Sequence, residues 1–199
     1  MTIEKPFSQP CENNKAPIFE HLERLLADAK TVLEVGSGTG QHAVYFAERL
    51  AHLRWLTSDL PEHHAGMNLW LDDYTGNNIE RPFAFNVDET WPEISVDAVF
   101  TANTLHIMGW SSVQNFFAGL PGILAPKAKL VVYGPFNYNG EFTSESNARF
   151  DLWLKDRNPV SGIRDFEAVN QLAEQAGLKL LEDNAMPANN RLLAWQKSV

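Results

Sequence analysis

A glycine-rich turn preceded by a carboxylate is the pattern in this sequence with the clearest chemical meaning. The eight residues EVGSGTGQ, from Glu34 to Gln41, follow a short apolar run at 31–33 and lead into a helical pattern. Glycine at every second position keeps Cβ atoms out of a tight turn, and lets backbone N–H groups at the following helix start approach a ligand. The segment is therefore predicted to be a strand, a turn and a helix that hold a nucleotide-type cofactor.

The spacing of these glycines separates two classes of cofactor. A dinucleotide site follows G-x-G-x-x-G, and its third glycine would fall at Gln41. This chain instead has acid-x-G-x-G-x-G, with Glu34 two residues before Gly36, which suits a ligand that carries an amino acid rather than a pyrophosphate. We therefore predict S-adenosylmethionine (SAM) as the cofactor. The residues of the turn predicted to bind it are Glu34, Gly36, Ser37, Gly38, Thr39 and Gly40.

A second carboxylate lies where an adenosine cofactor needs one. Asp59 ends the next predicted strand, 19 residues beyond Gly40, where a carboxylate can accept hydrogen bonds from both ribose hydroxyls. Asp59 could instead cap a helix, because Pro61 and Glu62 follow it. The glycine turn upstream favours the ribose role, and neighbouring Leu60 is assigned to the same site.

The ends of the third and fourth predicted strands offer further cofactor contacts. Asn86 and Val87 follow the third strand, where an amide oxygen could accept from an adenine amine while Val87 covers one ring face. A turn asparagine is an equally good interpretation of Asn86. Asn103 ends the fourth strand, beside the switch point of such sheets where ligands bind, although it too could be a turn residue.

His106 is the candidate catalytic residue. It lies three residues past Asn103 in N-T-L-H-I, so one helical turn could place both side chains over the methyl-donor pocket. If the acceptor is a hydroxyl, a neutral imidazole near pH 7 could remove its proton. The alternative is a core histidine between Leu105 and Ile107.

Alternating elements must position these residues. Strands that alternate with helices predict an α/β, Rossmann-like class I methyltransferase fold, with a mostly parallel seven-stranded sheet, an antiparallel C-terminal edge and helices on both faces. Residues 1–16 are predicted to form an irregular arm, and Pro17 is predicted in the first turn of a helix. The predicted strands are 31–35, 54–59, 82–86, 96–102, 129–133, 178–182 and 191–196, and the predicted helices are 17–29, 43–50, 111–124, 145–156 and 165–176.

The composition of the chain disfavours several classes of binding partner. The 199 residues fit a single domain, and a net charge of −9 disfavours nucleic acid. Cys11 is the only cysteine, the N-terminus has no apolar signal region, and no apolar stretch approaches the roughly 20 residues of a membrane helix, so we expect a cytoplasmic protein without membrane contact. The histidines show no metal-ligand spacing, and no metal is predicted.

Eight segments spread over the chain resemble the small family of SAM-dependent enzymes called methyltransferase-like 26, formerly a domain of unknown function. The resemblance implies the class I methyltransferase fold, with the glycine turn and Asp59 as cofactor contacts. It also draws Glu12, Asn14, Asn103, His106, Tyr133 and Asn190 toward the cleft. Asn13 and Asn86 depart from the family pattern, which prefers Arg and Asp there, and the second departure weakens the adenine assignment. The segments are CENNKAPI (11–18), LEVGSGTGQHA (33–43), SDLP (58–61), NTLHI (103–107), YGPF (133–136), SNARFD (146–151), GIRD (162–165) and MPANN (186–190).

The sequence is therefore interpreted as a SAM-dependent methyltransferase with an unidentified small-molecule acceptor. Asn14 is assigned to the cofactor, whereas the acceptor pocket is assigned to the arm, the 134–165 insertion and the MPANN loop, with Glu12, Tyr133, Arg164 and Asn190 as its residues. Arg164 could pair with Asp165 at the surface or bind a carboxylate or phosphate of the acceptor. Two other functions stay open: a non-catalytic SAM-binding protein and, disfavoured by Gln41, a nicotinamide-dependent oxidoreductase.

Overall fold

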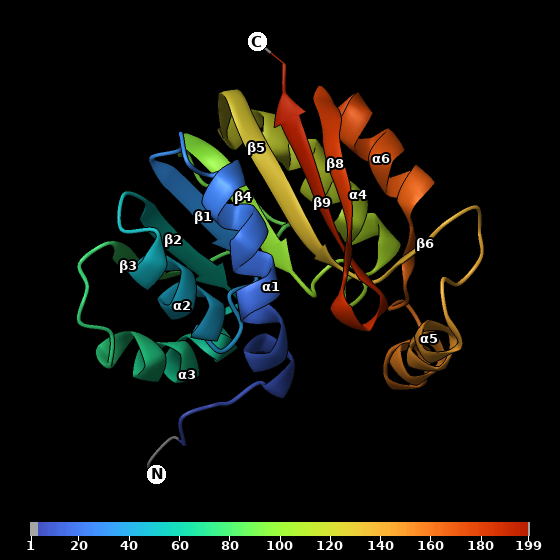
Figure 1. The fold of residues 1–199 in the computed structure, drawn as a ribbon, viewed down its shortest axis with the longest axis horizontal. Coiled ribbons are helices and arrows are strands. Elements are labelled where there is room, and N and C mark those ends of the chain that lie inside the picture. Colours follow the sequence, from blue (N-terminus) through green and yellow to red (C-terminus); the bar gives the residue numbers. More distant parts are fainter. Residues whose placement is uncertain (1–3, 199) are drawn as a thin grey trace.

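A computed structural model describes residues 4–198 of the chain (Figure 1). Within these residues, seven strands form one sheet in the order β3-β2-β1-β4-β5-β9-β8, and β6 and β7 pair separately. The strands are β1 (Thr31–Val35), β2 (Arg54–Asp59), β3 (Ile79–Ala84), β4 (Val96–Ala102), β5 (Leu124–Gly134), β6 (Phe136–Asn137), β7 (Arg164–Asp165), β8 (Leu178–Met186) and β9 (Asn190–Lys197). The helices are α1 (Gln9–Leu25), α2 (Gln41–Arg49), α3 (Pro61–Asp72), α4 (Trp110–Ile123), α5 (Glu145–Arg157), α6 (Phe166–Gln175) and the 3-10 turn η1 (Pro187–Asn189).

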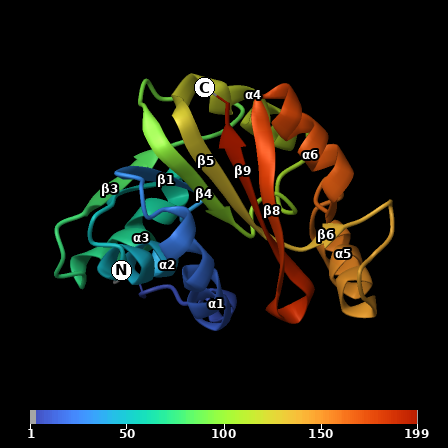
Figure 2. The same ribbon diagram turned by 45° about the horizontal axis from the view of Figure 1, so that its top comes forward.

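The sheet is parallel from β3 to β5 and antiparallel at its C-terminal edge. β1 pairs with β2 and β4 in parallel, whereas β9 runs antiparallel to both β5 and β8. Successive residues of each central strand enter different cores, because side chains alternate across a sheet. Val32 packs with α1 and α2, whereas Leu33 packs with α4 and α6 on the opposite face (Figures 1 and 2). The predicted fold class is confirmed.

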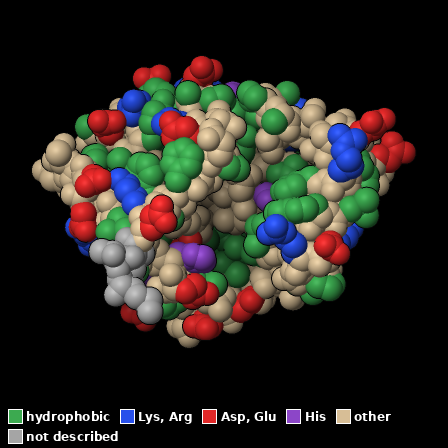
Figure 3. Space-filling view, turned by 90° about the horizontal axis from the view of Figure 1, so that it is seen from below, with side chains coloured by type: hydrophobic (Ala, Val, Ile, Leu, Met, Phe, Trp, Pro, Cys, Tyr) green, Lys and Arg blue, Asp and Glu red, His purple; other side chains and the backbone are tan. Residues whose placement is uncertain are grey.

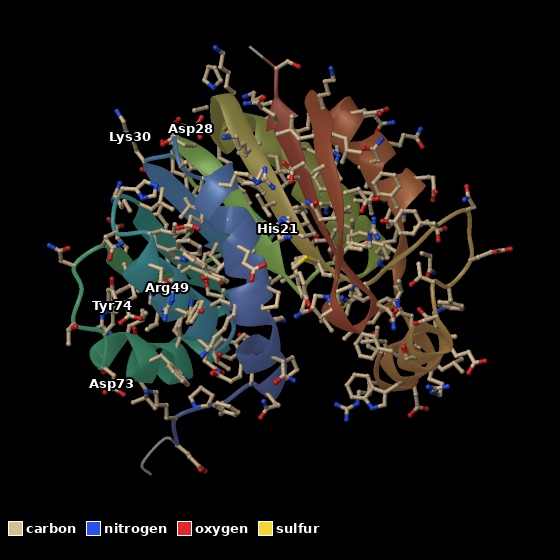
Figure 4. The ribbon with its side chains drawn as sticks, viewed as in Figure 1. His21, Asp28, Lys30, Arg49, Asp73 and Tyr74 are labelled. Atoms are coloured by element: carbon tan, nitrogen blue, oxygen red, sulfur yellow. The ribbon has the colours of Figure 1, made fainter. Side chains whose placement is uncertain are left out.

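The two ends of the sheet differ in character. Asp28 and Lys30 lie in the turn before β1, at the amino end of the central strands (Figure 4). There the Asp97 carboxylate accepts from the backbone N–H of Lys30 at 2.8 Å, and Lys129 pairs with Asp28 at 2.6 Å. The carboxyl ends of the strands lie at the opposite edge, which α5 and the start of α1 flank (Figure 1). None of the helices in residues 4–198 has both the length and the apolar character that crossing a bilayer requires.

The first helix begins earlier than predicted. Residues 4–8 are irregular, but α1 begins at Gln9, and residues 1–3 of the predicted arm lie outside the described part of the chain. Ser8 is its N-cap, because its side chain accepts from the Cys11 N–H at 3.3 Å, and Pro10 occupies the first turn, where a missing N–H costs nothing. Pro17 therefore lies inside the helix rather than in its first turn. The apolar pattern starts at Ile18, so periodicity alone placed the start too late.

Two other predictions on the β2–β3 side were incomplete. The third strand is Ile79–Ala84 rather than 82–86, and no helix was predicted where α3 lies. In α3 only Met67 and Leu71 are buried, so the helix leaves a weak hydrophobic period in the sequence. Polar and half-buried positions likewise blur β3, which is an edge strand.

Two glycines of α4 provide a test of packing against intrinsic helix propensity. A Cβ on Gly119 would lie 2.0 Å from the Trp91 ring, which is held by a bond from its Nε1 to the Val87 carbonyl and by edge contact with Phe85. Gly119→Ala should therefore destabilise the fold by about 1–3 kcal/mol despite the better helix propensity of alanine. A Cβ on Gly122 meets no atom within 4 Å, so Gly122→Ala should stabilise by about 0.5–1 kcal/mol. Urea unfolding of both variants measures the difference, and equal effects would contradict this account of the Trp91 contact.

Candidate functional site

A cleft of about 1020 Å³ opens at the carboxyl ends of the parallel strands. It is lined by the start of α1, the glycine turn, the segments that follow β2, β3, β4 and β5, one side of α5, and η1. Figure 3 views this edge from below and shows the surface hollowed at its middle, with hydrophobic side chains around the hollow. Open α/β sheets bind ligands at this edge, and the volume lies at the top of the roughly 300–1,000 Å³ range of small-molecule sites.

The glycine turn forms one wall of the cleft. Gly36 and Gly38 have φ values of +73° and +56°, in the left-handed region that side chains rarely adopt. A Cβ on Gly38 would meet no protein atom within 4 Å, so the space beside this glycine of the cleft lining is open. Ser37 and Thr39 also line the cleft, and their hydroxyls serve the turn: Ser37 Oγ accepts from the Ser58 N–H, and Thr39 Oγ1 donates to Gln41. The turn thus presents backbone rather than side chains to a ligand.

Asp59 connects the end of β2 to this turn. Its Oδ2 accepts from the Gly38 N–H at 2.7 Å, and its Oδ1 accepts from the Leu60 N–H at 2.7 Å. Leu60 is the N-cap residue of α3, and the helix start has no side-chain cap, so Asp59 does not have the capping role considered as its alternative. Each carboxylate oxygen has a further lone pair. Asp59 and Leu60 both line the cleft, and the carboxylate can accept from a ligand without losing its protein bonds.

Glu34 and Gly40 do not line the cleft, contrary to the prediction for both. The Glu34 side chain lies in the core below the turn, where it accepts from Trp55 Nε1 at 3.0 Å, and burial raises its pKa to about 7. The next residue, Val35, is the one at the end of β1 that lines the cleft. Gly40, at φ +87°, has a packing reason to be glycine, because a Cβ there would lie 2.9 Å from Met67 Cγ.

The start of α1 forms the wall next to the glycine turn, since the Ser8 N–H donates to Gln41 Oε1 at 2.6 Å. Asn14 lines the cleft, and its Oδ1 lies 2.6 Å from Nε2 of His42 in α2. Burial lowers the pKa of His42 to about 4, so the neutral imidazole joins the two helices. Glu12 was predicted in the acceptor pocket, but it does not line the cleft. Its carboxylate pairs with Lys15 one helical turn away and faces Gln41.

The residues that follow β3 also line the cleft, and the side chain of Asn86 forms hydrogen bonds within a turn. Asn86 Oδ1 accepts from the Asp88 N–H at 3.1 Å, and its Nδ2 faces Glu89. This is the turn geometry that was the alternative to adenine recognition. Val87 is buried and lines the cleft, so it remains available to cover a ring face.

His106 lies in the loop after β4, at the centre of the cleft wall. The loop begins at Asn103, whose φ is +58° and whose N–H donates to the Tyr133 carbonyl at 2.9 Å. The His106 ring is 5% exposed, contacts Phe150 edge-on, and makes no side-chain hydrogen bond within residues 4–198. Burial, and then the nearby Arg164 charge, lowers its pKa to about 4. The imidazole is therefore neutral at pH 7 with both nitrogens free of protein partners.

Arg164 was predicted in the acceptor pocket, but it does not line the cleft. It supports the His106 loop from behind. Its Nε donates to the Leu105 carbonyl at 3.1 Å, and its Nη2 donates to the carbonyls of Met108 and Val160. Neither Asp165 nor the cleft receives the guanidinium, so both sequence interpretations of Arg164 were wrong. Three backbone carbonyls left without partners by the loop attract the cation instead.

The remaining wall combines aromatic and amide side chains. Tyr133 and Asn190 line the cleft, and burial raises the pKa of the Tyr133 hydroxyl, which faces Asn14 and Asn190. Phe150 and Trp153 of α5 stack on each other with centroids 5.6 Å apart. Within residues 4–198, no three His, Cys, Asp or Glu side chains gather closely enough to form a metal site.

Several lining residues were not predicted to be in the site. They are polar or aromatic positions of segments whose placement only the fold decides, although most belong to the segments that resemble a known family. They include Ser8, Cys11, His42, Thr104, Asn147, Phe150 and Trp153.

Solved structures with the same fold include O-methyltransferases and other methyltransferases. An O-methyltransferase family protein from Burkholderia thailandensis matches with a TM-score of 0.83 and 18% identity over 94% of this chain and 57% of its own length. Human N-acetylserotonin methyltransferase, solved in complex with SAM, matches with a TM-score of 0.81 and 13% identity over 96% of this chain and 53% of its own. The mitomycin 7-O-methyltransferase MmcR matches with a TM-score of 0.78 and 17% identity over 94% and 54%, respectively.

This chain spans just over half the length of each of these three proteins. At such identities the likeness concerns the fold, which is that of the Rossmann-like methyltransferases. Residues 5–197 match the family model described as "Protein of unknown function (DUF938)". The chain therefore belongs to the DUF938 family.

Proposed function

We propose that this protein is a SAM-dependent methyltransferase that acts on a small-molecule acceptor. The observation that carries the proposal is the pairing of the glycine turn with Asp59, which leaves open backbone at Gly38 and spare carboxylate lone pairs facing one cleft. An adenosine cofactor with an amino-acid tail needs both features, and no side chain occupies that space. The volume of the cleft is sufficient for a second molecule beside the cofactor.

In this mechanism the protein supplies position and a proton acceptor. Asp59 would bind the ribose hydroxyls, and the glycine turn with Asn14 would surround the amino-acid end. When bound, SAM supplies an electrophilic methyl group on a sulfonium. His106 orients the acceptor hydroxyl and takes its proton as the oxygen becomes nucleophilic, while Arg164 holds the His106 loop in place. Walls formed by Phe150 and Trp153 exclude water from the acceptor.

We also propose membership of the methyltransferase-like 26 family. Seven of the eight segments that resemble it contribute residues to the cleft lining, and the eighth, 162–165, contains the Arg164 that supports the His106 loop. A resemblance that gathers around one cleft supports a shared ligand site rather than a shared scaffold alone. The O-methyltransferases of the same fold support an oxygen acceptor by analogy.

Binding of S-adenosylhomocysteine to an Asp59 variant tests the cofactor assignment. Asp59→Ala removes charge-assisted hydrogen bonds worth about 1.5–3 kcal/mol, so the Kd should rise about 10- to 100-fold by calorimetry. Asp59→Asn retains one acceptor oxygen and should give a smaller increase. Asp72→Ala is the matched control, because Asp72 is an exposed partner of Arg81 outside the cleft.

The same measurements separate the other two functions. Thermal stabilisation by NAD but not by S-adenosylhomocysteine would overturn the proposal in favour of an oxidoreductase. Tight binding of S-adenosylhomocysteine without methyl transfer to any member of a broad acceptor panel would favour a non-catalytic SAM-binding protein.

A further inference from the structure

The acceptor half of the cleft contains no ionised side chain. This half lies over the ends of β4 and β5 and is formed by the His106 loop, α5 and η1. No lysine or arginine of residues 4–198 lines the cleft, and its two carboxylates, Asp59 and Asp88, lie after β2 and β3 on the cofactor side. Lys155 forms an ion pair with Asp151, and Arg157 lies over the Trp153 ring. Neither cation lines the cleft. Arg164 lies behind the His106 loop, and its guanidinium donates to backbone carbonyls. An anionic acceptor would therefore lose its hydration without gaining a direct ion pair.

Aromatic side chains supply most of the apolar wall in this half. Phe150 stacks on Trp153 and meets the His106 ring edge-on at a centroid distance of 5.4 Å. Ile107 and Trp153 are about half exposed at the rim, and hydrophobic side chains surround the hollow in Figure 3. Aromatic walls favour flat apolar ligands through edge and offset-stacked contacts.

One buried amide in this half leaves a hydrogen-bond acceptor free. Asn147 is 5% exposed, and its Nδ2 donates to Thr143 Oγ1 and to the Asn189 carbonyl at 3.1 Å. A backbone carbonyl can only accept, so the amide orientation is set and Oδ1 is the atom without a donor. Within residues 4–198 the one side-chain atom both fully buried and unpaired is Asn137 Oδ1, so the unpaired Asn147 Oδ1 keeps some contact with solvent, and Asn147 and His106 both line the cleft.

We propose that the acceptor is an uncharged aromatic compound that carries a hydroxyl or N–H donor, with Asn147 Oδ1 as a specificity-determining acceptor for that donor. The inference rests on the proposed function only in calling this ligand the methyl acceptor. Its content, the chemical class that the β4–β5 half of the cleft binds, follows from the charge, the aromatic wall and the free Asn147 oxygen there.

Matched probes test the class of ligand. The Kd values of 2-naphthol and 2-naphthoate, which share one ring system and differ in charge at pH 7.5, are measured by ligand-observed NMR with the full chain saturated with S-adenosylhomocysteine. We expect 2-naphthol to bind at least 10-fold more tightly. Equal or tighter binding of 2-naphthoate, or no binding of either compound, would overturn the inference.

Two arginine substitutions test whether the missing counter-charge is the cause. Ser146→Arg places a cation in the cleft lining and should tighten 2-naphthoate binding at least 10-fold, whereas Glu145→Arg places it one residue earlier on the same helix, outside the lining, and should leave it unchanged. Equal responses of the two variants would contradict the assignment. If S-adenosylhomocysteine fails to bind but the 2-naphthol preference persists, the cofactor proposal fails and the ligand class stands.

Discussion

Replacing His106 with glutamine is expected to lower the rate of methyl transfer to a hydroxyl acceptor about 10²–10³-fold, because no general base is left to accept the hydroxyl proton. Glutamine retains a polar side chain of similar length but cannot take the proton. The affinity for S-adenosylhomocysteine should stay within about twofold, since His106 is not one of the proposed cofactor contacts. The rate is measured as S-adenosylhomocysteine release, with an uncharged phenol as acceptor.

The pH profile gives a second readout of the same residue. Burial holds the pKa of His106 near 4, so the imidazole stays neutral well below the ordinary histidine range. The His106-dependent part of the rate should therefore persist down to about pH 5 and fall as the pH approaches 4. Loss of activity near pH 6.5 would contradict the burial argument. His21 on α1 (Figure 4) does not line the cleft, and His21→Gln should leave both rate and profile unchanged.

The buried Glu34 carboxyl should make stability fall as the pH rises. Burial raises its pKa from 4.5 to about 7 in the folded chain, so the folded state holds a proton that the unfolded state has released. This favourable contribution is complete below pH 4.5 and is lost as the pH rises through about 7. Between pH 5 and pH 8 the loss amounts to about 2–3 kcal/mol of unfolding free energy.

Glu34→Gln isolates this effect, because a neutral amide can still accept from Trp55 Nε1. The unfolding free energy of the natural chain, minus that of the variant, should fall by about 2–3 kcal/mol from pH 5 to pH 8 in urea titrations. Glu23→Gln, at an exposed position of α1, is the control and should give a flat difference. A flat difference for Glu34→Gln as well would show that the carboxyl reaches solvent in the folded chain.

Local patterns were sufficient for the fold and for one wall of the cleft. Short apolar runs alternating with helical periods predicted β1, β2 and β4 closely, since buried parallel strands and amphipathic helices leave clear signals. Gly36, Gly38 and Asp59 were also predictable, because a ligand that approaches backbone requires particular residue types at a fixed spacing. Weakly patterned elements such as α3 were missed for the opposite reason.

The sequence by itself determined the sheet, the glycine turn and the carboxylate that joins it, because periodic apolar runs and particular residue types at fixed spacings mark these features. Only the tertiary structure decided that Glu34 turns into the core, that Arg164 supports the His106 loop from behind, and that Asn147 faces the cleft. Each of these depends on partners 21, 59 and 42 residues away, respectively. Local patterns carry no record of such pairings, since a polar residue forms whichever hydrogen bond the packed chain brings within reach.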